Sequence, residues 1–571
     1  MIENLRAEDP EMRLSSMRGI HVITQTLGPD RTKNELIPFL TDYLDDNDEV
    51  LRIFANALGT MIPEVGGIQF APALLHPLEL LCGLDEITVR DEAVASLQII
   101  GDTVFKTDGT AALQQDFIGL VQRLAKSDLP QARSSACSVV AVPYPHVPVG
   151  VKATLRQTFQ KLCSDEEIMV RRSACVALGK VFASILGQQA TDLLTPFASF
   201  CRDSSDGVRL QAVTTAISML RVLPDSGISQ VVSLLKTLSS DSSWRVRYMA
   251  ADRLGEIAKA FSPQDAQRVC APMFRTMCQD SEPEIRASAV HNMSHLLSVV
   301  TDATVRKDIL NVGTRLAGDQ NAHVRMCLAS SVLKSSLHAP PELWATSIVG
   351  TCTRLLQDTD ADVRLALLSG FNEMGDTAGA KELAPKLVPV VVGLFADPKW
   401  RIRETVVSQV ATLVTALGKS ADDVLDVCVK ALQDRVASIR SSGCDSCCKL
   451  LEQNGAQWFE TVLIPRVQPM VQSGSFMPRI TVLQLFASLA SAPQLDARTV
   501  QRVMLPTFNA LVNDKVANVR LNVAKAILAL RDHGKVTRGD VEGYLDRLSH
   551  DADEDVKDAA AGLIGGTKSV V

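Results

Sequence analysis

The chain has 571 residues, of which 46% are hydrophobic and 4% aromatic, and its 58 basic and 65 acidic residues give a net charge of −7. A negative chain is repelled by phosphate backbones and anionic bilayers, so nucleic acid and membrane surfaces are unfavoured partners. The few aromatic side chains and the 32 glycines argue against a many-stranded sheet protein. The composition therefore favours an all-α fold, and no polar linker divides it.

Residues 1–10 are acidic and lack the apolar segment of a signal peptide, and the longest apolar run, residues 387–396, is too short to cross a bilayer. The 13 cysteines are an odd number spread through helical segments, which fits reduced thiols in a cytosolic or nuclear compartment. We therefore expect a protein that is neither secreted nor inserted in a membrane.

One heptad recurs along the chain. Residues 241–247 read Asp-Ser-Ser-Trp-Arg-Val-Arg, and residues 397–403 read Asp-Pro-Lys-Trp-Arg-Ile-Arg, 156 residues later, or four times 39. Weaker copies extend the phase in both directions, so a basic residue recurs at intervals of 37 to 43. This basic column consists of Arg13, Arg52, Arg90, Arg133, Arg171, Arg209, Arg247, Arg286, Arg325, Arg364, Arg403, Arg440, Arg479, Arg520 and Lys557. The period predicts a single right-handed α-solenoid of about fifteen helical hairpins over residues 1–571.

The eleventh repeat shows how each hairpin is built. Residues 381–395 and 401–417 each carry an apolar stripe at helical spacing, and Asp397-Pro398 turns the chain between them. A proline also recurs 13 or 14 residues before the basic column, and it is expected to kink the first helix of its repeat. These prolines are Pro38, Pro77, Pro196, Pro272, Pro389, Pro465 and Pro506.

An aspartate precedes the basic residue by six positions in eleven of the fifteen repeats. An aspartate at the turn can accept N–H groups at the start of the second helix, and the arginine can reach the aspartate of the adjacent repeat. We therefore expect a ladder of ion pairs that sets the stacking angle. Exposed pairs are each worth only about 0–1 kcal/mol, so the ladder is expected to orient the repeats more than to stabilise them.

No motif in the sequence indicates catalysis or metal binding. The run Cys444-x-x-Cys447-Cys448 has no partner pair at zinc-site spacing, so its members are interpreted as small core residues. The sequence contains no phosphate-binding glycine loop, nucleophile elbow or zincin motif. We therefore expect no catalytic residue, no metal and no cofactor, and a protein that is not an enzyme.

Two of the four tryptophans, Trp244 and Trp400, stand at the turn between the helices, where most repeats have a small or polar residue. Each ring can cover a neighbouring turn, or it can anchor a partner protein beside the adjacent arginine, and the sequence leaves both interpretations open. Turns from successive repeats line up along one edge of a solenoid. That edge is expected to be a docking ridge.

The phased turns resemble HEAT repeats, and the sequence is similar to the scaffolding A subunits of protein phosphatase 2A. The resemblance is carried by residues 31–42, 241–249, 397–403 and 516–525. It implies a non-catalytic scaffold shaped as a horseshoe, monomeric alone and part of a heterodimer or heterotrimer in complex. It also implies that the ridge of residues 1–300 binds a regulatory B-type subunit, while residues 381–571, repeats eleven to fifteen, bind the phosphatase catalytic subunit.

The resemblance further implies contact residues on the two parts of the ridge. For the regulatory subunit they are Arg171, Arg172, Trp244 and Arg245, and for the catalytic subunit they are Lys399, Trp400, Arg401, Val436, Arg479, Val516 and Asn518. The alternative is a HEAT-repeat transport receptor of the karyopherin kind or another adaptor. The pairing of tryptophan and arginine at the turns favours the phosphatase scaffold.

Overall fold

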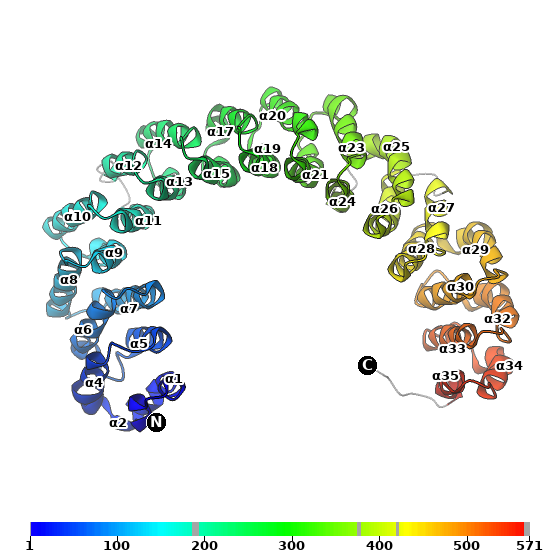
Figure 1. The fold of residues 1–571 in the computed structure, drawn as a ribbon, viewed down its shortest axis with the longest axis horizontal. Coiled ribbons are helices and arrows are strands. Elements are labelled where there is room, and N and C mark those ends of the chain that lie inside the picture. Colours follow the sequence, from blue (N-terminus) through cyan, green and yellow to red (C-terminus); the bar gives the residue numbers. More distant parts are fainter. Residues whose placement is uncertain (1, 185–192, 374–377, 418–421, 565–571) are drawn as a thin grey trace. The chain divides into compact units, whose positions relative to one another are not determined.

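The computed structural model describes residues 2–184, 193–373, 378–417 and 422–564. Every regular element in these ranges is a helix, as the composition predicted. The chain divides into two compact units, Met1–Met277 and Cys278–Val571. Both units are built from antiparallel helical hairpins (Figure 1).

The α-helices of the first unit are α1 (Pro10–Arg18), α2 (Ile20–Leu27), α3 (Pro29–Arg31), α4 (Ile37–Asp42), α5 (Asp48–Thr60), α6 (Pro72–Leu81), α7 (Ile87–Lys106), α8 (Ala111–Ala125), α9 (Pro130–Val139), α10 (Val149–Cys163), α11 (Ile168–Ser184), α12 (Leu194–Phe200), α13 (Asp206–Leu220), α14 (Asp225–Ser239), α15 (Trp244–Asp252), α16 (Leu254–Lys259) and α17 (Pro263–Met277).

The α-helices of the second unit are α18 (Pro283–His291), α19 (Met293–Val299), α20 (Ala303–Arg315), α21 (Ala322–Ser336), α22 (Pro341–Leu343), α23 (Val349–Leu356), α24 (Ala361–Ser369), α25 (Ala378–Gly393), α26 (Trp400–Leu417), α27 (Asp422–Ala431), α28 (Ala437–Trp458), α29 (Ile464–Val471), α30 (Phe476–Leu489), α31 (Ala497–Thr499), α32 (Leu505–Leu511), α33 (Ala517–Asp532), α34 (Arg538–Ser549) and α35 (Glu554–Ile564).

The helices of each unit form two rows. In the first unit the second helices of successive hairpins contact one another in the order α5, α7, α9, α11, α13 and α15, while α6, α8, α10, α12, α14 and α17 form the other row (Figure 1). In the second unit α21, α24, α26, α28, α30, α33 and α35 contact one another in the same way. Each hairpin therefore buries its apolar stripe against its neighbours in the stack, as in a solenoid.

Phenylalanine fills the space between the rows. Phe117 and Phe274 in the first unit and Phe486 and Phe508 in the second are less than 2% exposed. Phe486 and Phe508 meet edge to face with their ring centroids 6.1 Å apart, although they belong to successive hairpins. Such contacts join each repeat to the next through the core.

The recurring prolines lie in the first helices, as predicted, but the helix adapts to them in two ways. Pro38, Pro465 and Pro506 each follow a π-helical turn, which is η2 (Thr32–Leu36), η10 (Phe459–Leu463) and η11 (Val500–Met504), respectively. Pro77 and Pro272 instead lie inside the α-helices α6 and α17. A proline removes one backbone hydrogen bond and its ring crowds the carbonyl four residues earlier, and the wider π turn relieves that crowding.

Candidate docking surface on the inter-helix turns

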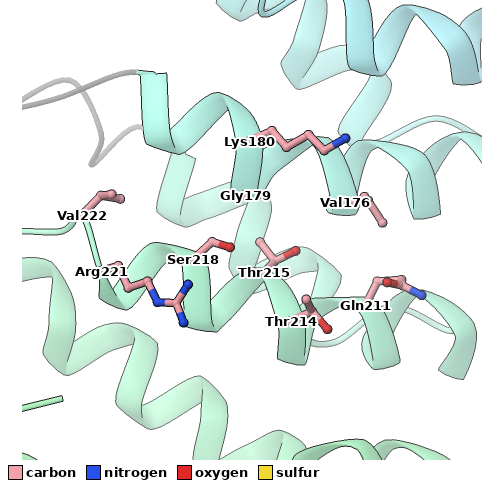
Figure 2. Close-up of a pocket in the computed structure, with 9 residues that line it drawn as sticks. All are labelled: Val176, Gly179, Lys180, Gln211, Thr214, Thr215, Ser218, Arg221 and Val222. Carbon is pink, nitrogen blue, oxygen red and sulfur yellow. The ribbon is translucent and has the colours of Figure 1, made fainter. Parts of the chain in front are cut away.

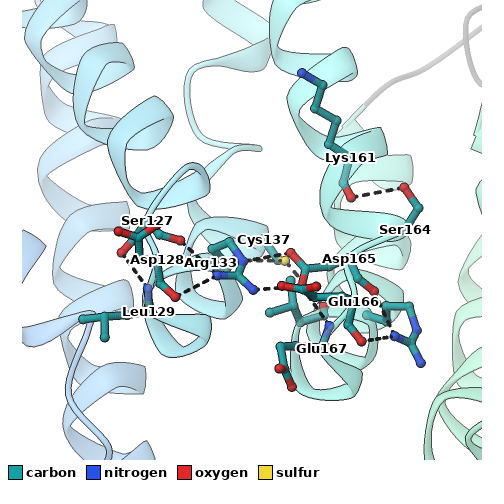
Figure 3. Close-up of polar contacts among 12 residues, drawn as sticks. Ser127, Asp128, Leu129, Arg133, Cys137, Lys161, Ser164, Asp165, Glu166 and Glu167 are labelled. Atoms are coloured by element: carbon teal, nitrogen blue, oxygen red, sulfur yellow. Dashed lines mark hydrogen bonds and ion pairs between the residues drawn. The ribbon is translucent and has the colours of Figure 1, made fainter.

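The turns between the two helices of a repeat are held by a ladder, and the step from Arg133 to Asp165 shows its geometry (Figure 3). Nε and Nη2 of Arg133 donate to the two carboxylate oxygens of Asp165 at 2.8 and 3.0 Å. One of these oxygens also accepts the backbone N–H of Glu167 at 3.0 Å, next to the start of α11. The aspartate thus caps its own repeat and receives the arginine of the preceding one, as predicted.

The same ion pair recurs in both units with nitrogen to oxygen distances of 2.6 to 2.9 Å. The pairs are Arg13–Asp46, Arg133–Asp165, Arg171–Asp203 and Arg209–Asp241 in the first unit, and Arg286–Asp319, Arg325–Asp358, Arg364–Asp397, Arg403–Asp434, Arg479–Asp514 and Arg520–Asp551 in the second. Both members are largely buried; for example, the side chains of Arg209 and Asp241 are 14% and 7% exposed.

The spacing of six residues between the turn aspartate and the column arginine also places the arginine against the backbone of its own turn, which the sequence pattern did not indicate. Nη1 of each ladder arginine donates to the backbone carbonyl six residues earlier, as Arg209 does to Asp203 O at 2.7 Å. The bond is also made where that residue is not an aspartate, as from Arg133 to Ser127 O at 3.0 Å. The arginine therefore closes its own turn with one nitrogen and binds the next repeat with the other two.

Electrostatics at the ladder follow from this geometry. Burial acts to raise the pKa of Asp203, but the hydrogen bonds from Arg171 and from the Ser205 N–H outweigh it, so the pKa is lowered. Conversely, the hydrogen bond to Asp203 raises the pKa of Arg171. The Arg171–Asp203 pair is therefore fully charged at neutral pH.

The ladder is interrupted where the sequence lacks the aspartate. Leu84, Ser127 and Ser473 stand at the aspartate position, and the preceding column residues are Arg52, Arg90 and Arg440. Arg52 pairs instead with Glu49 of its own helix at 2.9 Å and, more distantly, with Glu92 of α7 at 3.7 Å. Arg90 and Arg440 form no ion pair within the described ranges of the chain, although both still donate to the carbonyls of their own turns.

A column of exposed apolar side chains lies on the same turns. Each stands three residues before a column arginine and is 42% to 58% exposed: Ile87, Ile168 and Trp244 in the first unit, and Trp400 and Phe476 in the second. We call these five residues the apolar anchors. Ladder ion pairs hold the turns of Ile168, Trp244 and Trp400 and one side of the turn of Phe476, so these anchors are presented in fixed register within their unit, which is a property of protein interfaces. The turn of Ile87 is closed only by the bonds from Arg90 to its own carbonyls.

The two predicted tryptophans are exposed. Trp244 and Trp400 are 46% and 42% exposed, and each begins its helix, α15 or α26. The guanidinium carbons of Arg245 and Arg401 lie 6.0 and 5.5 Å from the centroids of these rings, within cation–π range. Lys399 is exposed beside Trp400, and its N–H donates to Asp397. More than half of each residue is buried against its own repeat, and the exposed part is accessible to a partner protein.

Other predicted contact residues also lie at the turns. Val436 and Val516 are half-buried N-caps of α28 and α33, and their N–H groups donate to Asp434 and Asp514 at 2.9 Å. Asn518 is exposed two residues after Val516, in the first turn of α33. Arg172 is exposed on α11, so it remains available to a partner.

Arg171 and Arg479 require a correction, because both belong to the ladder. Arg479 is 6% exposed and pairs with Asp514 at 2.8 Å, and Arg171 pairs with Asp203 at 2.7 Å. Successive residues of a helix point about 100° apart, so Arg172 faces solvent while Arg171 faces the next repeat. Both guanidinium groups are therefore bound within the stack.

A separate pocket of about 420 Å³ lies between α11 and α13 (Figure 2). Lys180, Arg221 and three hydroxyl side chains, those of Thr214, Thr215 and Ser218, contribute to its lining, and no carboxylate lines it among the described residues. Lys180 lies 12 residues, or about 18 Å of helix, beyond Ile168, which begins α11 at the inter-helix turn. The pocket is therefore not part of the docking surface on the turns.

The cysteine run forms no reactive or metal-binding centre within the described residues. All 13 cysteines are free thiols, and burial raises the pKa of Cys444 above its ordinary value and that of Cys448 to about 12. Within the described ranges, no three His, Cys, Asp or Glu side chains come together as metal ligands, and no helix has the length and apolarity to cross a bilayer.

The sequence resembles a group of phosphatase subunits. It is 38% identical over 267 residues to the regulatory A subunit of protein phosphatase PP2A from Schizosaccharomyces pombe, covering 46% of this chain and 45% of that one. It is 35% identical over 379 residues to the beta isoform of the human 65 kDa regulatory A subunit of serine/threonine-protein phosphatase 2A, covering 65% and 62%. The alpha isoform from Arabidopsis thaliana is 44% identical over 185 residues, covering 32% and 31%. The matches thus span less than two thirds of these relatives, and they confirm the predicted resemblance.

Two further comparisons concern the fold. A model for the PIK3R4-like middle domain matches residues 229–469. Among solved structures, Kap121p bound to Pho4p has a TM-score of 0.60 at 14% identity, covering 93% of this chain and 57% of that chain. Kap95p with RanGDP has a TM-score of 0.59 at 13% identity, covering 98% and 72%. At such identities the likeness shows a shared helical solenoid and nothing of function.

Proposed function

We propose that this chain, a relative of the 65 kDa A subunits of protein phosphatase 2A, is a non-catalytic scaffold that holds two partners on its inter-helix turns, a phosphatase catalytic subunit with a regulatory B-type subunit. The observation that carries the proposal is the set of apolar anchors Ile168, Trp244 and Trp400 on turns that the ladder holds in register. Exposed aromatic side chains beside arginine are the usual centres of protein interfaces.

The turns of the first unit are proposed to receive the regulatory subunit. Trp244 is the central anchor, Arg245 stacks beside it, and Arg172 offers a second cation two repeats earlier. Ile168, which shares its turn with Arg172, extends the apolar surface. A partner with apolar pockets rimmed by acidic residues fits this arrangement.

The turns from Lys399 to Asn518 are proposed to receive the catalytic subunit. Trp400 fills an apolar pocket of the partner, while Lys399 and Arg401 steer an acidic surface toward it. Val436 and Val516 present half-buried apolar side chains on later turns of the same unit. Phe476, on the turn between those two, supplies an anchor that the resemblance did not indicate.

The same proposal excludes catalysis by this chain and places it in the cytosol or nucleus. The relatives are named as regulatory or scaffold subunits, and the buried thiols have raised pKa values that disfavour nucleophilic thiolates. Thirteen free thiols suit a reducing compartment. The transport-receptor alternative has weaker support, because the karyopherins share only the fold with this chain.

Mass spectrometry of a tagged full-length chain recovered from cells tests the proposal. Phosphatase catalytic and regulatory subunits should be captured together, and serine/threonine phosphatase activity should co-purify with them. Capture of nucleoporins and import cargo without a phosphatase would support the transport receptor instead. The purified chain alone should be a monomer by light scattering and should not hydrolyse phosphopeptides.

A further inference from the structure

The ladder of the second unit is broken at the turn between α29 and α30, where a serine replaces the aspartate. Ser473 follows Arg440 by 33 residues, and the completed steps span 31 to 35 residues. Ser473 Oγ accepts the N–H of Ser475 at 3.3 Å, the bond that Asp434 accepts from Val436 at 2.9 Å. Ser473 therefore takes the place of the ladder aspartate but lacks its charge.

Arg440 has the geometry of a ladder arginine without the acid that the others bind. Its Nη1 donates to Asp434 O at 2.9 Å and to Arg435 O at 3.2 Å, as ladder arginines do in their own turns. Its Nε is buried and has no hydrogen-bond partner in the described part of the chain. Nε of Arg479 also lacks an aligned hydrogen bond, but that nitrogen lies 2.8 Å from an oxygen of Asp514, whereas Arg440 pairs with no carboxylate of the described residues.

We propose that Ser473 is a phosphorylation site whose phosphate group binds Arg440 and completes the ladder at this step. A phosphoserine carries a charge of about −2 and three acceptor oxygens, and a guanidinium binds such a group through two parallel hydrogen bonds. Nε and Nη2 of Arg440 are the nitrogens with which other ladder arginines bind aspartate, as Arg403 does through both. The phosphate therefore takes over the role of the missing carboxylate.

The modification is a phosphoryl transfer from a nucleoside triphosphate bound to a serine/threonine protein kinase. Ser473 Oγ attacks the γ-phosphorus, and the bond from that phosphorus to the bridging oxygen of the β-phosphate breaks. The nucleoside diphosphate leaves with the electron pair of that bond, and the serine proton passes to a base of the kinase. No other co-reactant is needed.

The surroundings of Ser473, which is half-buried, favour a phosphate, because the neighbouring ladder carboxylates of Asp434 and Asp514 are already paired with Arg403 and Arg479. No acidic residue occurs between positions 471 and 495. Gln472, Gly474 and Ser475 are exposed, and the side of Gly474 on which a Cβ would lie is open. The ladder arginine of this turn, Arg479, donates to the Ser473 carbonyl and adds a second positive charge.

The other serine at an aspartate position, Ser127, is a poorer acceptor site. Ser127 stands at the ladder position that would pair with Arg90, which is buried and also lacks an ion pair in the described ranges. However, Asp128 adjoins Ser127 in the same turn, and the turn that carries Arg90 contains Asp85 and Glu86. These carboxylates would repel a phosphate dianion, so the proposal is confined to Ser473.

The test uses the full-length chain alone, so its outcome does not depend on the proposed phosphatase partners. Phosphoserine is inserted at position 473 during translation, with phosphoserine at position 475 as the matched control. Amide hydrogen exchange should slow about tenfold in residues 434–440 and 473–480 for the first protein and stay unchanged for the second. The protection should disappear when Arg440→Gln is combined with phosphoserine at 473. Equal exchange in the two phosphoproteins, or protection that survives Arg440→Gln, would overturn the assignment.

Two further measurements cover the case in which Arg440→Gln does not fold. Ser473→Asp should have a higher thermal midpoint than the uncharged, nearly isosteric Ser473→Asn, because only the first restores the ladder carboxylate, and equal midpoints would contradict the proposal. The folded wild-type chain is also incubated with a panel of purified serine/threonine kinases and MgATP, and phosphate is mapped by mass spectrometry. Modification of Ser473 by a member of the panel supports the proposal, and its absence from Ser473 counts against it.

Discussion

Replacing Trp400 with alanine should weaken catalytic-subunit binding by an amount that follows from its exposed area. The residue is 42% exposed, and a fully accessible tryptophan side chain offers about 250 Å². About 105 Å² is therefore available to a partner, which at about 25 cal/mol per Å² corresponds to about 2.6 kcal/mol of binding free energy. Ordering the ring in the complex costs about 0.5 kcal/mol, so the net loss is about 2 kcal/mol, or about thirtyfold in Kd.

Isothermal titration calorimetry of the full-length chain with purified catalytic subunit measures this loss. Trp244→Ala is the matched control, because it removes the same ring from the same turn position in the other unit and should leave this Kd unchanged. The thermal midpoint of Trp400→Ala should stay near that of the wild type, since the ring begins α26 and is largely exposed. A Kd within about twofold of the wild type, with the fold intact, would remove Trp400 from the interface.

Three other predictions concern the regulatory surface and the ladder. Changing Trp244 and Arg245 together to alanine should weaken binding of a regulatory subunit by at least about 2 kcal/mol in calorimetry and leave catalytic-subunit binding intact. Unfolding of the double variant would instead show that Trp244 packs within the stack. Arg209→Ala should lower the free energy of unfolding by about 2 kcal/mol in urea titrations, because it leaves Asp241 partly buried and unpaired. Arg52→Ala should cost less than about 0.5 kcal/mol, because its pair with Glu49 is exposed and its pair with Glu92 is long, at 3.7 Å. The pKa of Asp203 is lowered in the folded chain, so its contribution to stability is present above its unfolded pKa of about 3.9 and is lost as the pH falls through the folded value. The urea concentration at the unfolding midpoint should therefore fall as the pH drops below about 4. The fall should be smaller for Asp203→Asn, which has no carboxylate to protonate.

The ladder was predictable because its signal is periodic. A fixed spacing between Asp and Arg recurs along the whole chain, and each copy supports the same interpretation of the others. The breaks were predictable for the same reason: Ser473 departs from the column, and the structure shows Arg440 without a carboxylate of the described residues there. The bond from the arginine to the backbone carbonyl six residues earlier could not be predicted from the sequence, because every residue type carries that carbonyl.

The contact residues were harder to assign from the sequence. The resemblance predicts Arg171 and Arg479 as interface residues, whereas their place in the basic column indicates that they face the next repeat, as the structure shows. Ile87 was missed because a single isoleucine at a turn is unremarkable in composition, and only the phase, three residues before Arg90, marks it. The π turns before some prolines also left no sequence signal, because a π turn differs from an α turn by one residue of hydrogen-bond register.

The separation between ladder and anchor positions has a physical basis. The arginine lies in the first turn of the second helix, where its nitrogens reach both its own turn and the next, so it cannot change without disturbing two repeats. The anchor stands three residues earlier, as Trp400 does at the first position of α26, where the backbone N–H has no partner within the helix. Apart from Ala361, which is buried, the side chains at this position are at least partly exposed, and they vary from tryptophan to isoleucine or alanine without loss of the ladder. One residue per repeat is therefore free to define which partner surface fits a given turn.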